Sequence, residues 1–231
     1  MKIFYCLLLI ALIFQSQSFA AFTCPDRSDY FCITPEMNPQ SIVSPIQFTN
    51  IPLTIMALFS KEISKTGYPI QLDAQWESPY FGGGVIFYEG QFKIMLLGGT
   101  VRTQQMTLDA YAAIVCHEIG HIIGGTPFQT ITGAEWSSSE GQSDFFAASV
   151  CLPRYFNSMG VATDKILERV EKAGFEMVTA LNIFDPSIKV LRFIKDESIV
   201  LETLINNYPS YQCRYENFRN PSIRPACWFK K

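Results

Sequence analysis

The only two histidines of this chain, His117 and His121, lie in the stretch YAAIVCHEIGHIIGG, with Glu118 between them. Side chains four residues apart project from one face of a helix, so the two imidazoles can bind one metal ion. Glu118 is turned about 100° around the helix axis, beside such an ion, where its carboxylate can accept a proton from water. The spacing predicts a zinc site with an adjacent general base. A pair of core histidines without a metal is the alternative.

A catalytic zinc ion needs a third protein ligand, and no other histidine exists. Pro127 stands where metzincins carry their third histidine, which excludes that class. Glu140 follows after a stretch long enough for a loop and a return onto a second helix, and Asp144 lies one turn further on the same face. The chain offers Glu135 as a competing ligand. Acids that complement the dipole of a helix N-terminus are the ordinary explanation for Glu140 and Asp144.

The HExxH motif followed by Glu140-Gly-Gln-Ser-Asp144 resembles the gluzincins, zinc peptidases with ExxxD on a second helix. The resemblance implies that Glu140 is the third zinc ligand and that Asp144 hydrogen-bonds the first histidine, which fixes its tautomer. The segment LGGTVRTQQMTLDAYAAIVCHEIGH is also similar to the prenyl-CAAX and HtpX-like peptidases of this group. The similarity covers roughly Gly98 to Arg214, in scattered pieces.

The chain departs from this family near its C-terminus. Family members carry a His-Pro pair followed by an arginine, whereas here tyrosine, Tyr208, takes the place of the histidine and Arg214 has the expected spacing. A tyrosine hydroxyl can donate to the oxyanion of a tetrahedral intermediate, or Tyr208 is a packed surface aromatic. Tyr155 and Tyr211 are the alternative donors. The resemblance implies that Arg214 pairs with Asp144; a solvated charge is the alternative.

Hydrophobic periodicity and turn residues indicate an α+β domain with a zincin-like arrangement, a small antiparallel-edged sheet on the motif helix and a mostly helical C-terminal part. The motif helix is predicted to begin after Thr107 as N-cap and to end before Gly124-Gly125. The first predicted element is a helix that Pro52 opens and Gly67 ends, with Leu53, Met56, Phe59 and Ile63 on one face. A strand in YPIQLDAQWE and two strands joined at Glu89-Gly90 follow. The remaining elements are helices from Leu108 to Ile123 and from Ser138 or Ser139 to Pro153, and a mostly helical stretch from Thr163 to Asn207.

The composition gives no sign of a nucleic-acid partner. The net charge is -3, the isoelectric point is near 5.5, and the basic residues are scattered. A chain of 231 residues, 48% of them hydrophobic, is long enough for one sizeable core, so residues 21–231 are expected to form a single domain. Neither feature indicates an oligomeric state.

The N-terminus has the features of a signal peptide covering residues 1–20. Lys2 precedes an apolar run from Ile3 to Phe14, and Ser18-Phe19-Ala20 provides the small residues at the cleavage site. A retained membrane anchor is the alternative, although the run is short for a membrane span and no later run is long enough. The expected mature protein is exported, periplasmic or extracellular, and not inserted in a membrane.

Six cysteines remain after signal cleavage, and an even number in an exported chain favours disulfide bonds. Six cysteines permit 15 pairings. Proximity along the chain favours the pairs Cys24–Cys32 and Cys213–Cys227, which leaves Cys116 with Cys151.

These expectations combine into an exported, zinc-dependent peptidase acting on peptide or protein substrates, with Glu118 as general base. An extended substrate would add a strand along an exposed edge, for which the apolar stretch Phe92 to Leu97 is the candidate; core packing explains that stretch equally well. A zinc-binding envelope chaperone or interaction protein with weak or no turnover is one alternative. A disulfide-stabilised structural protein without a metal is the other.

Overall fold

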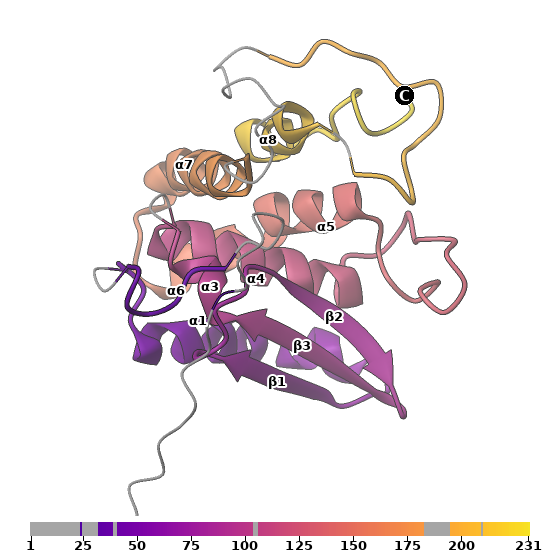
Figure 1. Ribbon diagram of the computed structural model, residues 1–231. Helices are drawn as coiled ribbons and strands as arrows, with labels where there is room; N and C mark the ends of the chain where they lie inside the picture. The colour runs from indigo at the N-terminus through magenta and orange to yellow at the C-terminus, as the bar shows by residue number, and fades with distance from the viewer. Residues whose placement is uncertain (1–23, 25–31, 39–40, 104–105, 183–194, 209) are drawn as a thin grey trace, which may run out of the picture.

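The computed structural model describes residues 24, 32–38, 41–103, 106–182, 195–208 and 210–231 (Figure 1). The predicted signal peptide lies outside this range. The expected α+β class is confirmed, since a three-stranded sheet packs together with several helices. Figure 1 shows the sheet on one side of helix α4 (Leu108–Ile123), with α7 (Thr163–Asn182) on the other side. Within the described residues, every helix is too short or too polar to cross a membrane.

The first helix, α1, spans Pro45–Leu58 and begins earlier than Pro52, where the sequence placed its start. Ser44 caps it, because its hydroxyl accepts from the Gln47 amide and the Gln47 side chain accepts from the Ser44 amide. Pro52 is tolerated inside the helix because the carbonyl it leaves without a helical donor, that of Phe48, accepts a 2.8 Å hydrogen bond from the Tyr111 hydroxyl.

A short second helix, α2 (Ser60–Ser64), follows directly, and Gly67 with positive φ ends the helical region as expected. Phe59 and Ile63 are buried in the core, as the predicted apolar face requires, but Leu53 is 47% exposed. The face was therefore assigned correctly only toward its C-terminal end.

The sheet consists of β1 (Ile70–Gln75), β2 (Gly83–Tyr88) and β3 (Gln91–Leu97), in the order β1-β3-β2. The predicted turn at Glu89-Gly90 is confirmed, and both residues have the positive φ of a tight hairpin. β3 pairs antiparallel with β2 and parallel with β1. The expectation that Phe92 to Leu97 is an exposed edge is therefore wrong, because strands occupy both of its sides. β2 is an edge strand.

Helix α4 has the predicted bounds, and the Thr107 hydroxyl accepts from the Ala110 amide at 3.1 Å, as an N-cap should. A four-residue helix, α3 (Gly98–Val101), joins β3 to the segment before α4. Residues 110–122 of α4 are all buried. A helix covered on every side holds its side chains in fixed positions, which a metal site on it requires.

The second motif helix begins at Glu140, directly after the predicted start at Ser138 or Ser139, but runs past Pro153. It consists of α5 (Glu140–Phe146), a π-helical segment η1 (Ala147–Cys151) and α6 (Leu152–Ser158). Pro153 lies in the first turn of α6, directly after the π-helical segment, where a missing N–H costs little.

The C-terminal part is less helical than the sequence indicated. Helix α7 ends at Asn182, and residues 195–207 form no helix; residues 183–194 lie outside the described range. The irregular segment forms backbone hydrogen bonds with the C-terminal tail instead of within a helix. The amides of Val200 and Leu204 donate to the carbonyls of Ala226 and Trp228. A further helix, α8 (Tyr211–Arg219), was not predicted.

Both disulfide bonds that sequence proximity favoured are present, and so is the remaining pair, Cys116–Cys151. Their Cα–Cα distances are 5.6 Å for Cys24–Cys32, 5.6 Å for Cys116–Cys151 and 5.9 Å for Cys213–Cys227. These values lie within the range usual for disulfides. Two of the bonds involve a cysteine directly preceding a candidate site residue, since Cys116 precedes His117 and Cys213 precedes Arg214.

Candidate metal centre

Helices α4 and α5 approach each other closely at Gly120. A Cβ at this position would lie only 2.9 Å from the Cα atom and the carbonyl oxygen of Ser143, so a larger residue would push the helices apart. This contact brings the face of α4 that carries His117 and His121 against the first turn of α5, which carries Glu140.

Three side chains converge between these helices, and they are the set that the sequence predicted. The Nε2 atoms of His117 and His121 are 3.1 Å apart. One Glu140 oxygen lies 3.2 Å from Nε2 of His117, and the other lies 3.6 Å from Nε2 of His121. All three residues are buried, and together they could hold a metal ion. Glu135 is not among them, because it is exposed and its carboxylate accepts from the Gly133 amide.

Asp144 lies behind His117, and Arg214 lies behind Asp144. The carboxylate of Asp144 is 2.7 Å from Nδ1 of His117 and accepts two hydrogen bonds from Arg214, at 2.8 and 3.0 Å. The pairing that the resemblance implied is thus present, and Arg214 is buried, not solvated. Although burial alone would lower the pKa of His117, the Asp144 carboxylate raises it to about 10. The site therefore favours a positive charge next to Nε2.

His121 is oriented by groups that sequence reasoning missed. Its Nδ1 lies 2.9 Å from the carbonyl oxygen of Ser138 and 3.0 Å from the hydroxyls of Ser137 and Ser143. A carbonyl can only accept, so Nδ1 carries the proton and Nε2 presents a lone pair to the centre. A backbone carbonyl leaves no signature in a sequence, and nothing in the spacing of these serines singles them out.

The carboxylates of the site differ in their ionisation. Burial raises the pKa of Glu118, against the opposing effect of the imidazoles of His117 and His121. Burial would also raise the pKa of Glu140, but the same imidazoles and Arg214 outweigh it and lower that pKa to about 2. Glu140 is therefore ionised at neutral pH, whereas the protonated form of Glu118 is favoured more than it is in water.

Glu118 lies beside the centre with part of its hydrogen-bonding capacity unused. The residue is buried, and its Oε2 has no hydrogen-bond partner among the described residues. Its Oε1 points toward the edge strand, where a Cβ on Gly83 would lie 3.9 Å away. An unpartnered buried carboxylate oxygen is costly, which indicates that it acts on something bound next to it.

Of the three tyrosines considered from the sequence, Tyr208 is the one beside the metal centre. It lines the space around His117, Glu118 and Glu140, and burial of its hydroxyl end and the Glu140 carboxylate raise its pKa. The residue as a whole is still 68% exposed. Tyr155 is buried in the core on α6 instead, and Tyr211 lines the apolar cavity described below.

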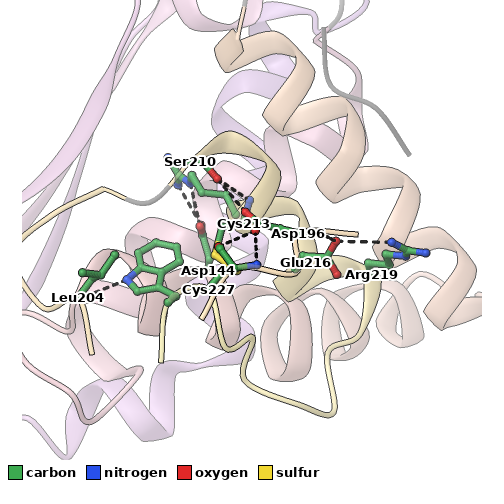
Figure 2. The surroundings of a disulfide bond; sticks show 11 residues. Asp144, Asp196, Leu204, Ser210, Cys213, Glu216, Arg219 and Cys227 are labelled. Carbon is green, nitrogen blue, oxygen red and sulfur yellow. Dashed lines mark hydrogen bonds and ion pairs between the residues drawn. A yellow bond between two sulfur atoms is a disulfide. The ribbon is translucent and has the colours of Figure 1, made fainter. Parts of the chain in front are cut away.

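A C-terminal clasp, formed by Cys213, Cys227 and Trp228, fastens α8 to α5 (Figure 2). The disulfide joins α8 to the tail, and the indole of the fully buried Trp228 covers Gly141, where a Cβ would come within 2.2 Å of the ring. The indole N–H donates to the Leu204 carbonyl at 2.8 Å. Arg214 directly follows Cys213, and Glu140 directly precedes Gly141. The clasp therefore holds in place the two helices that carry Arg214 and Glu140.

No protein-family model, no curated protein and no solved structure matches this chain. The function must therefore be inferred from the site itself. Asp196, Cys213 and Cys227 also lie close together, but the two sulfurs form a disulfide and cannot serve as thiolate ligands.

Proposed function

We propose that this protein is a zinc-dependent peptidase with a zincin-like fold, in which His117, His121 and Glu140 hold the metal. The observation that carries the proposal is the convergence of these three side chains beside Glu118, whose Oε2 has no partner among the described residues. Two neutral imidazoles and one carboxylate form a ligand set typical of catalytic zinc, which keeps one position open for water or substrate.

The donor set fits zinc in size as well as in chemistry. Four tetrahedral ligands at about 2.0–2.1 Å from Zn²⁺ lie about 3.3 Å from one another. The three donor–donor distances here, 3.1, 3.2 and 3.6 Å, lie close to that value. Asp144 and the Ser138 carbonyl hold the Nδ1 atoms of the two histidines, which leaves both Nε2 lone pairs for the metal.

The chemistry assigned to the chain's own groups is the hydrolysis of a peptide bond. When bound, Zn²⁺ supplies Lewis-acid polarisation of the scissile carbonyl and lowers the pKa of the attacking water. Glu118 accepts the proton from this water as its oxygen bonds to the carbonyl carbon, and delivers the proton to the amide nitrogen as the C–N bond breaks. The raised pKa of Glu118 suits both transfers.

The substrate is proposed to lie along the outer edge of β2. Gly83 and Gly84 begin this strand and border the centre. A Cβ at Gly84 would meet no atom within 4 Å, so an extended peptide can approach the strand closely. Main-chain hydrogen bonds to an edge strand bind peptides of many sequences. The three disulfides favour an oxidising compartment, which supports the proposed export to the periplasm or outside the cell.

The test of this proposal is metal analysis of the purified protein combined with a peptide-library digest, with and without a chelator. We expect about one zinc per chain and cleavage that stops on chelation and returns with added zinc. Zinc without any cleavage would favour the second candidate, a zinc-binding interaction protein. The replacement of the family histidine by Tyr208 is the feature that supports this candidate. Absence of bound metal would contradict both.

Tyr208 is proposed to donate its hydroxyl to the oxyanion that forms on the scissile carbonyl. Changing Tyr208→Phe should lower kcat by about 100-fold, the smaller end of the range for the loss of one oxyanion donor. The effect should lie at this end because water can reach the exposed residue and replace part of its hydrogen bonding. Zinc content should not change. The matched control is Tyr88→Phe, an exposed tyrosine on β2. An unchanged kcat would remove Tyr208 from the mechanism.

The clasp is proposed to support the metal through Arg214 and Asp144. Replacing Cys213 and Cys227 together by Ser should weaken zinc binding by about 10- to 100-fold, as loss of groups behind a ligand does. The free energy of unfolding should fall by about 2–4 kcal/mol. A competition titration with a chromophoric chelator measures the first effect and thermal unfolding the second. The double Ser variant of Cys24 and Cys32 is the control, and zinc affinity equal in both variants would refute this role.

A further inference from the structure

A cavity of about 480 Å³ opens directly beside His117 and Glu118. Its walls away from these two residues are largely apolar, and they come from four separate parts of the chain. The apolar contributors are Phe81 before β2, Ile114 on α4, Met177 and Leu181 on α7, and Tyr211 on α8. We refer to it as the apolar cavity.

A second, smaller cavity of about 220 Å³ is lined by the three proposed metal ligands themselves, His117, His121 and Glu140. Polar groups such as Gln129, Ser137 and Glu140 contribute to its lining. The two cavities share Gly83, His117, Glu118 and Tyr208. A group reacting at the centre therefore borders two unequal spaces, the small polar cavity that contains the metal ligands and the larger apolar cavity next to it.

Away from His117, Glu118 and Tyr208 at the metal centre, the polar side chains Thr100, Ser210 and Arg214 of this cavity already have hydrogen-bond partners within the protein. Two guanidinium nitrogens of Arg214 are bound to Asp144. The Thr100 hydroxyl donates to the Gly82 carbonyl and accepts from the Gly82 amide. The Ser210 hydroxyl accepts from the Cys213 amide at the start of α8. A charged side chain placed among these groups would lose its hydration without gaining a partner, which is costly.

We propose that the apolar cavity binds one bulky apolar side chain of the substrate, so that the bond cut is next to a residue such as Phe, Leu or Met. This inference rests on the proposed peptidase function. The apolar cavity has the volume and the apolar walls typical of small-molecule sites, whereas the smaller polar cavity contains the metal ligands and offers no comparable apolar space. The protein is therefore expected to select the substrate side chain on only one side of the scissile bond.

The first experiment uses short peptides of Gly, Ser and Ala that differ at one varied position, occupied by Phe, Leu, Ala, Asp or Lys. For the zinc-loaded protein, kcat/KM should be roughly 100-fold higher with Phe or Leu than with Ala, because each methylene in an apolar pocket contributes strongly. Asp and Lys should be no better than Ala. Mass spectrometry should locate the cut at a peptide bond of the varied residue.

The second experiment measures binding without turnover. The zinc-loaded Glu118→Gln protein should bind the Phe peptide more tightly than the Ala peptide, as measured by calorimetry. In the otherwise unchanged protein, Leu181→Trp narrows the apolar cavity and should reduce the Phe-to-Ala ratio of kcat/KM by about tenfold or more. The matched control is Leu167→Trp, which places the same side chain on an exposed position of α7 and should leave that ratio unchanged. Thermal unfolding verifies that both variants fold.

The outcomes separate this inference from the function on which it rests. Chelator-sensitive cleavage with no preference for Phe or Leu, or with a preference for Asp or Lys, would overturn the inference and leave the peptidase function intact. Preferential binding of the Phe peptide without any cleavage would support the cavity's role and overturn the peptidase function. Equal binding of the Phe and Ala peptides by the Glu118→Gln protein would also overturn the inference.

Discussion

The Glu118→Gln protein is expected to keep its zinc and to lose catalysis, with kcat reduced by about 10³-fold. The amide has the shape of the carboxylate but cannot accept the proton of the attacking water. The fold should not suffer, because burial raises the pKa of Glu118 and so already disfavours its charged form. Zinc content, thermal unfolding and peptide cleavage measured on one preparation test all three expectations.

The control for this substitution is Glu168→Gln, which makes the same chemical change on the exposed face of α7. It should leave zinc content and kcat as they are. If the Glu118→Gln protein retained normal turnover, this residue would not be the base. If it lost zinc, Glu118 would be needed to assemble the centre, and the separation of ligand and base assigned here would be incorrect.

Removing the third ligand should have a different effect. In the Glu140→Ala protein, we expect zinc affinity to fall by more than about 100-fold, since even groups behind a ligand contribute 10- to 100-fold. Glu140 is ionised at neutral pH because His117, His121 and Arg214 outweigh its burial and lower its pKa to about 2. The substitution thus removes a full negative charge from the metal position. A chelator competition titration measures the affinity directly.

Glu135→Ala is the matched control, because Glu135 is the other acid that the sequence offered as a ligand. It is exposed and bonded to the Gly133 amide, so its loss should not affect zinc binding. Equal zinc affinity in the Glu140→Ala and unsubstituted proteins would refute the three-ligand centre. Lower affinity in the Glu135→Ala protein would instead mean that the loop carrying it closes onto the metal.

Local geometry explains which features could be predicted from the sequence. The bounds of α4, the turn at Glu89-Gly90 and the start of α5 close to Ser139 each depend on neighbours a few residues away in the chain. The failures have causes further away. The apolar spacing between residues 195 and 207 is compatible with a helix, but hydrogen bonds to the C-terminal tail hold this segment in an irregular form. Pro52 resembles a helix start in the sequence, whereas in the fold Tyr111 satisfies the carbonyl that this proline leaves free.

The sequence alone determined which side chains share a face of α4 and which cysteines are near enough in the chain to pair. It also determined that Glu140 and Asp144 lie one turn apart on the second motif helix. Helical periodicity and chain proximity are sufficient for these features. Only the tertiary structure decided that Glu140 and not Glu135 meets the histidines, that β3 is the central strand and β2 an edge strand, and that a large apolar cavity lies beside Glu118. Those features depend on backbone groups, which all residues share, and on contacts between segments far apart in the chain. Neither can be recognised from the residue types within a short stretch of sequence.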